Sequence, residues 1–105
     1  MIFTQTRTFE KELRKLKLSN KHKNDIFSDF EEMTSERASN YSYYMAGIWK
    51  TCKKYKKGRY RISFAYCSEC INKYREYVGC EFCDEENLER IVLIHIELRK
   101  EGTYR

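Results

Sequence analysis

Residues 91–98, Ile91-Val92-Leu93-Ile94-His95-Ile96-Glu97-Leu98, are the segment on which the fold depends, because they carry the strongest strand signal in the chain. Successive side chains of a strand point to opposite faces of a sheet. Strict alternation places Val92, Ile94, Ile96 and Leu98 on one face and Ile91, Leu93, His95 and Glu97 on the other. The segment therefore predicts a strand that presents His95 and Glu97 on the same face.

The same period of two appears earlier in the chain, from residue 59. Tyr60, Ile62, Phe64 and Tyr66 alternate there with Arg59, Arg61, Ser63 and Ala65. This pattern predicts a strand over 59–66 with one apolar face and one basic face. We expect two further strands, a short edge strand over 1–6 and another over 74–82.

Between these strands the apolar residues recur at the spacing of a helix. Thr8 is the expected N-cap of a first helix, whose apolar stripe consists of Phe9, Leu13 and Leu16. Ser19-Asn20 interrupts that stripe and is expected to cap a second helix, with an apolar stripe formed by Ile26, Phe27, Phe30 and Met33. Residues 35–47 are rich in tyrosine and predict a connection or a weak third helix.

The predicted order is strand, helix, helix and three strands. An antiparallel sheet with both helices packed on one face is the simplest solution, so we expect an α+β fold. The 105 residues have room for one domain, residues 1–105. No stretch reaches the ~18 apolar residues of a membrane span, and the first residues lack the apolar core of a secretory signal. We therefore expect a cytoplasmic protein with no membrane partner.

The positive charge is concentrated in the middle of the chain. The net charge is +5, and residues 35–66 carry eight basic side chains against one acidic. Within 50–61 seven of twelve side chains are cationic and none is anionic. Such a stretch favours binding to a phosphate backbone, and a solvated basic loop is the alternative. The expected RNA-binding residues are Lys50, Lys53, Lys54, Lys56, Lys57 and Arg59.

Four of the five cysteines form two paired motifs, Cys67-x2-Cys70 and Cys80-x2-Cys83, with nine residues between them. Two such pairs supply the four thiolates of a tetrahedral structural zinc site. We therefore predict a zinc-binding hairpin over 67–83, with unrelated buried or redox cysteines as the alternative. Cys52 lies outside the pattern and is expected to be a small buried apolar residue.

Three passages also resemble a known family. They are the opening residues 2–16, the pair Gly58-Arg59-Tyr60-Arg61-Ile62 and Tyr74-Arg75-Glu76-Tyr77, and the closing residues 91–104. In that order they resemble the first strand and amphipathic helix, the Tyr-Arg strand motifs, and the last strand and basic tail of the RelE/ParE superfamily of toxins. The four-cysteine segment and the tyrosine-rich connection differ from the usual pattern of this superfamily.

The resemblance implies a RelE-like endoribonuclease that cleaves mRNA, commonly on the ribosome, without a catalytic metal and with a cognate antitoxin as partner. The 2′-hydroxyl attacks the adjacent phosphate, so the protein must stabilise the added charge and move protons. The family's cationic positions match Arg61, Arg75 and either Arg99 or Lys100, and its C-terminal tyrosine matches Tyr104.

The strand patterns lead independently to some of the same residues. If the helices cover the apolar face, Arg61, His95 and Glu97 share the uncovered face, here called the open face, and Arg75 joins them if its strand aligns. His95 and Glu97 are then candidates for proton transfer. The alternative for His95 is a surface hydrogen bond without a catalytic role.

Two other functions compete with the ribonuclease. One is a non-catalytic zinc-ribbon regulator that binds nucleic acid through residues 50–61 and exposed tyrosines. The other is a ParE-like protein that acts on DNA gyrase. Gyrase inhibition needs no proton-transfer groups, so Arg61, His95 and Glu97 favour the ribonuclease.

Overall fold

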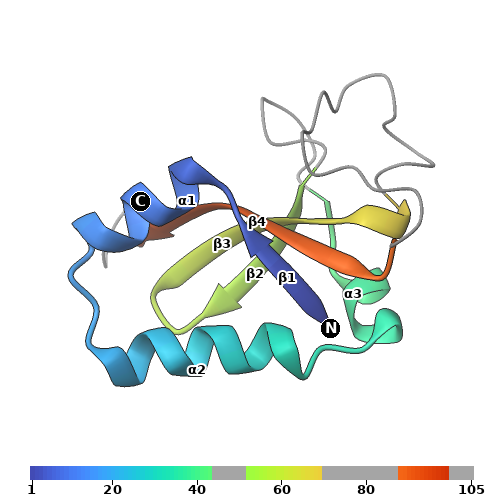
Figure 1. Cartoon of the computed structure of the whole chain (residues 1–105), viewed down its shortest axis with the longest axis horizontal. Helices are drawn as coiled ribbons and strands as arrows, with labels where there is room; N and C mark the ends of the chain where they lie inside the picture. The colour runs from blue at the N-terminus through green and yellow to red at the C-terminus, as the bar shows by residue number, and fades with distance from the viewer. Residues whose placement is uncertain (44–51, 70–87, 100–105) are drawn as a thin grey trace.

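A four-stranded sheet, three helices and a further helical segment over 67–69 make up the parts of the chain that the computed structural model describes, residues 1–43, 52–69 and 88–99 (Figure 1). The elements in chain order are β1 (Ile2–Gln5), α1 (Arg7–Lys15), α2 (Asn20–Glu31), α3 (Ser35–Asn40), β2 (Lys53–Lys57), β3 (Tyr60–Tyr66) and β4 (Arg90–Leu98). The expected α+β class is confirmed. The predicted strand over 74–82 lies outside the described residues.

The sheet is mixed, with the strand order β1-β4-β3-β2. β2 pairs with β3 and β3 pairs with β4, both antiparallel, whereas β1 runs parallel to β4. The expectation of a wholly antiparallel sheet is therefore wrong for β1. No tight turn joins β1 to β4, and only such a turn would force these two strands to run in opposite directions.

β2 is a strand that the sequence analysis did not anticipate. It forms a hairpin with β3 through the two-residue loop Gly58-Arg59, where Gly58 has a φ of +57°. A glycine with positive φ at the first loop position suits the tight turns that join antiparallel strands. The four lysines of β2 concealed its period of two, in which Lys53, Tyr55 and Lys57 lie on one face.

The helices begin close to the predicted positions. α1 is capped by Thr6, whose hydroxyl accepts a hydrogen bond from the Phe9 amide at 3.1 Å, and not by Thr8 as expected. Thr6 has the extended backbone that an N-cap requires, and its hydroxyl also donates to the Ile94 carbonyl at 3.2 Å. Ser19 caps α2 as predicted. Residues 35–40 form the third helix, one of the two expected alternatives for this segment.

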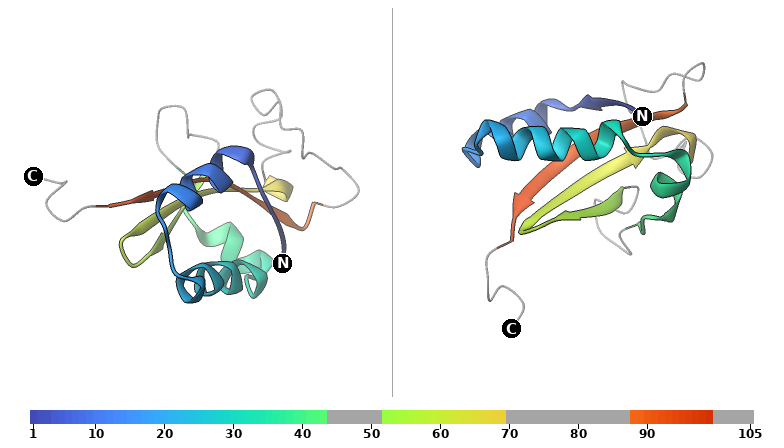
Figure 2. Two further views of the ribbon diagram at one scale, coloured as in Figure 1. Left: turned by 60° about the vertical axis from the view of Figure 1, so that its left-hand side comes forward. Right: turned by 90° about the horizontal axis from the view of Figure 1, so that it is seen from below.

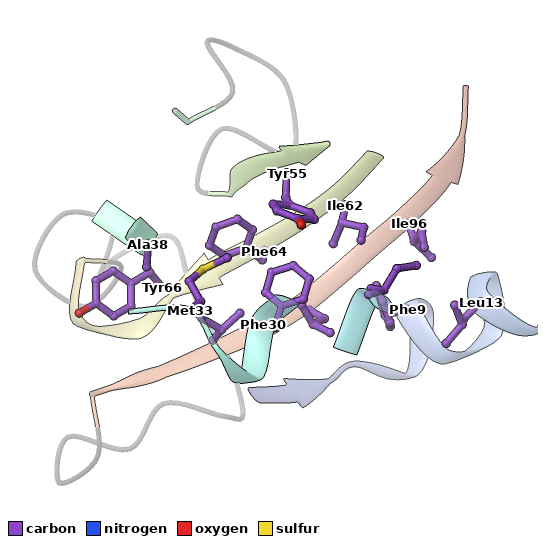
Figure 3. Close-up of a cluster of buried hydrophobic side chains, with 13 residues drawn as sticks. Phe9, Leu13, Phe30, Met33, Ala38, Tyr55, Ile62, Phe64, Tyr66 and Ile96 are labelled. Carbon is purple, nitrogen blue, oxygen red and sulfur yellow. The ribbon is translucent and has the colours of Figure 1, made fainter. Parts of the chain in front are cut away.

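The main core lies between one face of the sheet and the helices (Figures 2 and 3). Phe9 and Leu13 of α1 and Ile26 and Phe30 of α2 supply its helical side. The strands contribute Tyr55, Ile62, Phe64, Tyr66, Ile91, Leu93 and Ile96. Burying an aliphatic or aromatic side chain of this size is worth about 1.5–3 kcal/mol, so this cluster fixes α1 and α2 against the sheet.

A β-bulge changes the phase of β4 at Ile94. Ser63 pairs with His95 and Phe64 pairs with Leu93, so Ile94 is an extra residue in β4. One added residue exchanges the faces of everything beyond it. The strict alternation predicted for 91–98 is therefore wrong in its first half. Ile91 and Leu93 join Ile96 in the main core, and Val92 and Ile94 pack with Ala65 and Cys67 in a second cluster.

Candidate active site on the open face

The strand register brings three predicted site residues together. Arg61 of β3 pairs directly with Glu97 of β4, and Ser63 pairs with His95 two residues away. All four lie on the face of the sheet opposite Ile62 and Ile96 of the main core, which is the predicted open face, but Ser63 is fully buried, so this face is covered at that position. Directly paired residues have their Cβ atoms about 4.5–5.5 Å apart, so the Arg61 and Glu97 side chains are neighbours. The alternation of β3 and of the second half of β4 predicted this grouping.

His95 lies between two carboxylates. Its Nδ1 is 2.6 Å from Oε2 of Glu12, and its Nε2 is 3.6 Å from Oε2 of Glu97. The His95 side chain is 17% exposed, whereas that of Glu97 is 56% exposed. The imidazole is therefore held firmly on one side and faces a solvent-accessible carboxylate on the other, an arrangement suited to proton transfer.

Glu12 was missed by the sequence analysis. It belongs to α1, and only the packing of α1 beside β4 brings it to the site. β1 pairs with β4 no further than Leu93, so no strand of the described chain continues along the outer edge of β4 beyond that residue. There Oε1 of Glu12 accepts a hydrogen bond from the Ile96 amide at 3.3 Å. A carboxylate next to an apolar helical stripe gives no sequence signal for such a contact.

The hairpin turn orients Arg61. Its guanidinium donates to the carbonyl oxygens of Gly58 and Tyr60, both at 3.3 Å. At the same end of the sheet the Arg99 amide donates to the Arg59 carbonyl at 2.7 Å, which holds the end of β4 beside the turn. Three arginines therefore lie around the end of the open face that carries Glu97.

The basic stretch is divided between the two faces of β2. Lys54 and Lys56 are exposed and lie on the open face, paired with Ser63 and Arg61. Lys53 and Lys57 lie on the opposite face. A solvated loop, the alternative expectation for this stretch, is excluded for Lys53–Lys57, because these residues form a strand.

Lys53 is buried, which corrects its assignment to the RNA-binding residues. Its side chain is 0% exposed and its ammonium donates to the carbonyls of Ala38 at 2.6 Å and Ser39 at 3.0 Å, at the end of α3. It also pairs with Glu69 at 3.0 Å. A buried charge that is fully engaged in this way is structural. Cationic groups are favoured at helix C-termini, where unpaired carbonyls gather.

The pKa of Glu69, the ion-pair partner of Lys53, is lowered in the folded chain. Burial raises the pKa of Glu69, but hydrogen bonds from Lys53, Ser39 and Tyr43 outweigh it and hold the pKa below its usual value. The carboxylate therefore stays ionised and keeps Lys53 paired.

The Lys57 ammonium also forms an ion pair on the face of β2 opposite the open face. This ammonium is 2.8 Å from Oδ2 of Asp29 on α2, and the Tyr55 hydroxyl donates to the same oxygen. Burial raises the pKa of Asp29, but the hydrogen bonds from Lys57 and Tyr55 outweigh it and lower the pKa overall. Burial and the bond to Asp29 raise the pKa of Tyr55. Lys57 thus fastens α2 to β2.

Several predicted site residues lie outside the described residues: Lys50, Arg75, Lys100, Tyr104, Cys70, Cys80 and Cys83. Cys67 is described and is buried directly after β3. Within 1–43, 52–69 and 88–99, no three His, Cys, Asp or Glu side chains gather as a metal site would require. Cys52 is 2% exposed, as expected. No helix in these same ranges is long and apolar enough to cross a membrane.

No model of a protein family matches the chain, and no curated protein or solved structure shows significant similarity to it.

Proposed function

We propose that this chain is an endoribonuclease of the RelE-like toxin type that cleaves mRNA, on the ribosome or free. One observation carries the proposal. His95, Glu97 and Arg61 meet on the open face, where a proton-transfer pair and a cation lie side by side. The resemblance of three passages of the sequence to the RelE/ParE superfamily supports the same function, and implies a cognate antitoxin as partner.

The cleavage reaction needs two kinds of group. The RNA 2′-oxygen loses its proton and bonds to the adjacent phosphorus, and the bond from phosphorus to the 5′-oxygen breaks as that oxygen gains a proton. His95 and Glu97 are proposed to carry these protons, with Tyr104 as a further candidate. Arg61 is proposed to stabilise the charge that builds on the phosphate, together with Arg75 and Arg99 or Lys100. This chemistry requires no metal.

The RNA backbone is proposed to follow the exposed cations. Lys54, Lys56 and Arg59 are exposed, and Lys50 belongs to the same stretch of sequence. Lys53 and Lys57 are excluded from this set, because each is held by a carboxylate on the opposite face. Phosphate contacts of this kind position the RNA without reading its sequence.

The test is to express the protein, two site variants and two control variants, and to map RNA ends by sequencing, with and without ribosomes. We expect Arg61→Ala to slow cleavage by about 10²–10³ and Glu97→Gln by about 10²–10⁴. Arg14→Ala and Glu32→Gln, which change exposed residues of α1 and of the C-cap of α2, are matched controls and should cleave normally. If the wild type leaves RNA ends unchanged under both conditions, the ribonuclease proposal fails. Binding without cleavage would indicate the nucleic-acid-binding regulator.

We also propose that Cys67, Cys70, Cys80 and Cys83 hold one structural zinc ion. The spacing of the paired motifs supports it, and zinc bound at such a site contributes directly to folding. Metal analysis should find one zinc per chain. Cys67→Ser should lose the metal, whereas Cys52→Ser, at a buried cysteine outside the motifs, should retain it. Purified protein without zinc would contradict the proposal.

A further inference from the structure

We propose that Glu12 is the positioning residue of this site: it holds the neutral imidazole of His95 with its proton on Nδ1, so that Nε2 is the nitrogen that exchanges a proton with RNA. The inference rests on the proposed ribonuclease function for the role of Nε2. The tautomer itself is a separate property of the folded chain and is measured without RNA.

The donor and acceptor roles follow from the contact between the two side chains. An ionised carboxylate only accepts hydrogen bonds, so the nitrogen 2.6 Å from Oε2 of Glu12 must be the donor. That nitrogen is Nδ1. In the neutral ring the lone pair then lies on Nε2, on the side of Glu97. Histidine in water favours the opposite tautomer, so this assignment differs from the default.

Glu12 is itself held by β4, the strand that carries His95. While Oε2 contacts the His95 ring, Oε1 accepts from the amide of Ile96, the next residue of β4. One carboxylate thus binds both the side chain of His95 and the backbone that follows it. This double contact sets the distance and the orientation of the ring, as a partner on the far side of a reacting group must do.

The element that carries Glu12 is fixed on both sides of this residue. Phe9 and Leu13 of α1 are 0% and 6% exposed in the main core. The Thr6 amide donates to the Leu93 carbonyl at 3.0 Å, and its hydroxyl donates to the Ile94 carbonyl. The start of α1 is thereby bound to β4 at the two residues that precede His95.

The two carboxylates next to His95 have different roles. Glu12 lies within hydrogen-bond distance of Nδ1, and its side chain is 25% exposed. Glu97 is 3.6 Å from Nε2, beyond a hydrogen bond, and is 56% exposed beside Arg61. The close contact assigns the orienting role to Glu12, and the more exposed carboxylate lies on the side where RNA would bind.

The first experiment measures the tautomer in the full-length protein. The chain has two histidines, and His22 on α2 is exposed and serves as the internal reference. Long-range proton–nitrogen spectra of 15N-histidine-labelled protein in alkaline buffer report which nitrogen carries the proton, with His95→Asn used for assignment. We expect Nδ1–H for His95 and mainly Nε2–H for His22. Glu12→Ala should shift His95 towards Nε2–H, while Glu10→Ala, at an exposed residue of the same helix, should leave it unchanged.

The second experiment measures RNA cleavage by the same variants, after their folding has been verified by circular dichroism. Glu12→Ala should slow cleavage by about 10–100-fold, the usual effect of removing a partner that orients a functional group. Glu12→Gln keeps one acceptor oxygen and should restore part of the rate. Glu10→Ala should cleave at the wild-type rate.

The two proposals fail on different results. An Nε2–H tautomer in the wild type, or an unchanged tautomer in Glu12→Ala, would overturn the role of Glu12 whatever the RNA assay shows. So would a folded Glu12→Ala variant that cleaves RNA at the full rate. A wild type that cleaves no RNA would instead overturn the ribonuclease proposal, and with it the function assigned to Nε2.

Discussion

The two halves of β4 have opposite surroundings. Residues 90–93 lie between β1 and β3, and Ile91, Val92 and Leu93 are all buried, on both faces of the sheet. Residues 95–98 have β3 on one side and α1 on the other, and only Ile96 is buried. His95 is partly buried, and Glu97 and Leu98 are exposed. The first half holds the fold together, and the second presents polar groups.

This difference shows how one strand both builds the core and carries the candidate site residues. The bulge at Ile94 lets the first half bury Ile91 and Leu93 and still lets the second half bury Ile96, so His95 and Glu97 face away from the core. Bulges commonly redirect side chains beside functional sites. The buried half therefore supports the half that carries the candidate chemistry.

Replacing a leucine by alanine in each half of β4 should give the largest contrast in stability. Leu93 is 0% exposed and Leu98 is 41% exposed. Leu93→Ala should lower the free energy of unfolding by about 2–5 kcal/mol, because it leaves a cavity between the sheet and the helices. Leu98→Ala should change it by less than about 1 kcal/mol, since the side chain is largely in water already. Urea denaturation of both variants measures the difference. Equal losses would show that the two halves are equally packed.

A smaller contrast is expected between two adjacent lysines of β2. Lys53→Met should destabilise the fold by about 1–3 kcal/mol, because it leaves the Ala38 and Ser39 carbonyls without this donor and Glu69 without its ion-pair partner. Lys54→Met, on the open face, should change stability by less than about 0.5 kcal/mol. It should instead weaken RNA binding. The slope of log affinity against log salt concentration should fall by about one, because one phosphate contact is lost. A reduced slope in a folded Lys53→Met variant would contradict the division of β2 into two faces.

The smallest expected effect is the pH dependence contributed by Glu69. Its pKa is lowered in the folded chain from the usual value of 4.5. The unfolded chain therefore binds more protons in acid, and stability is lost as the pH falls below about 4.5 and through the folded pKa. Thermal unfolding between pH 7 and pH 3 should show this loss. Glu69→Gln should flatten that part of the curve, and an unchanged curve would exclude this contribution.

Local patterns determined much of the fold. The positions of α1 and α2, the Ser19 cap, β3 and β4 follow from periods of 3.6 and two, which depend only on neighbouring residues. The placement of Arg61 and Glu97 on one face follows from the same alternation. These features were predictable because each is set within one element by the geometry of its own backbone.

Contacts between distant segments decided the rest. The parallel pairing of β1 with β4, the bulge at Ile94 and the cap at Thr6 depend on how strands and helices fit together. The burial of Lys53 depends on the carbonyls of α3 and on Glu69. Glu12 reaches His95 only because α1 packs beside an edge of β4 that β1 leaves uncovered. The sequence by itself determined which residues have the chemistry for a site, and the tertiary structure decided which of them meet, because hydrogen bonds and ion pairs between side chains form only over a few ångströms.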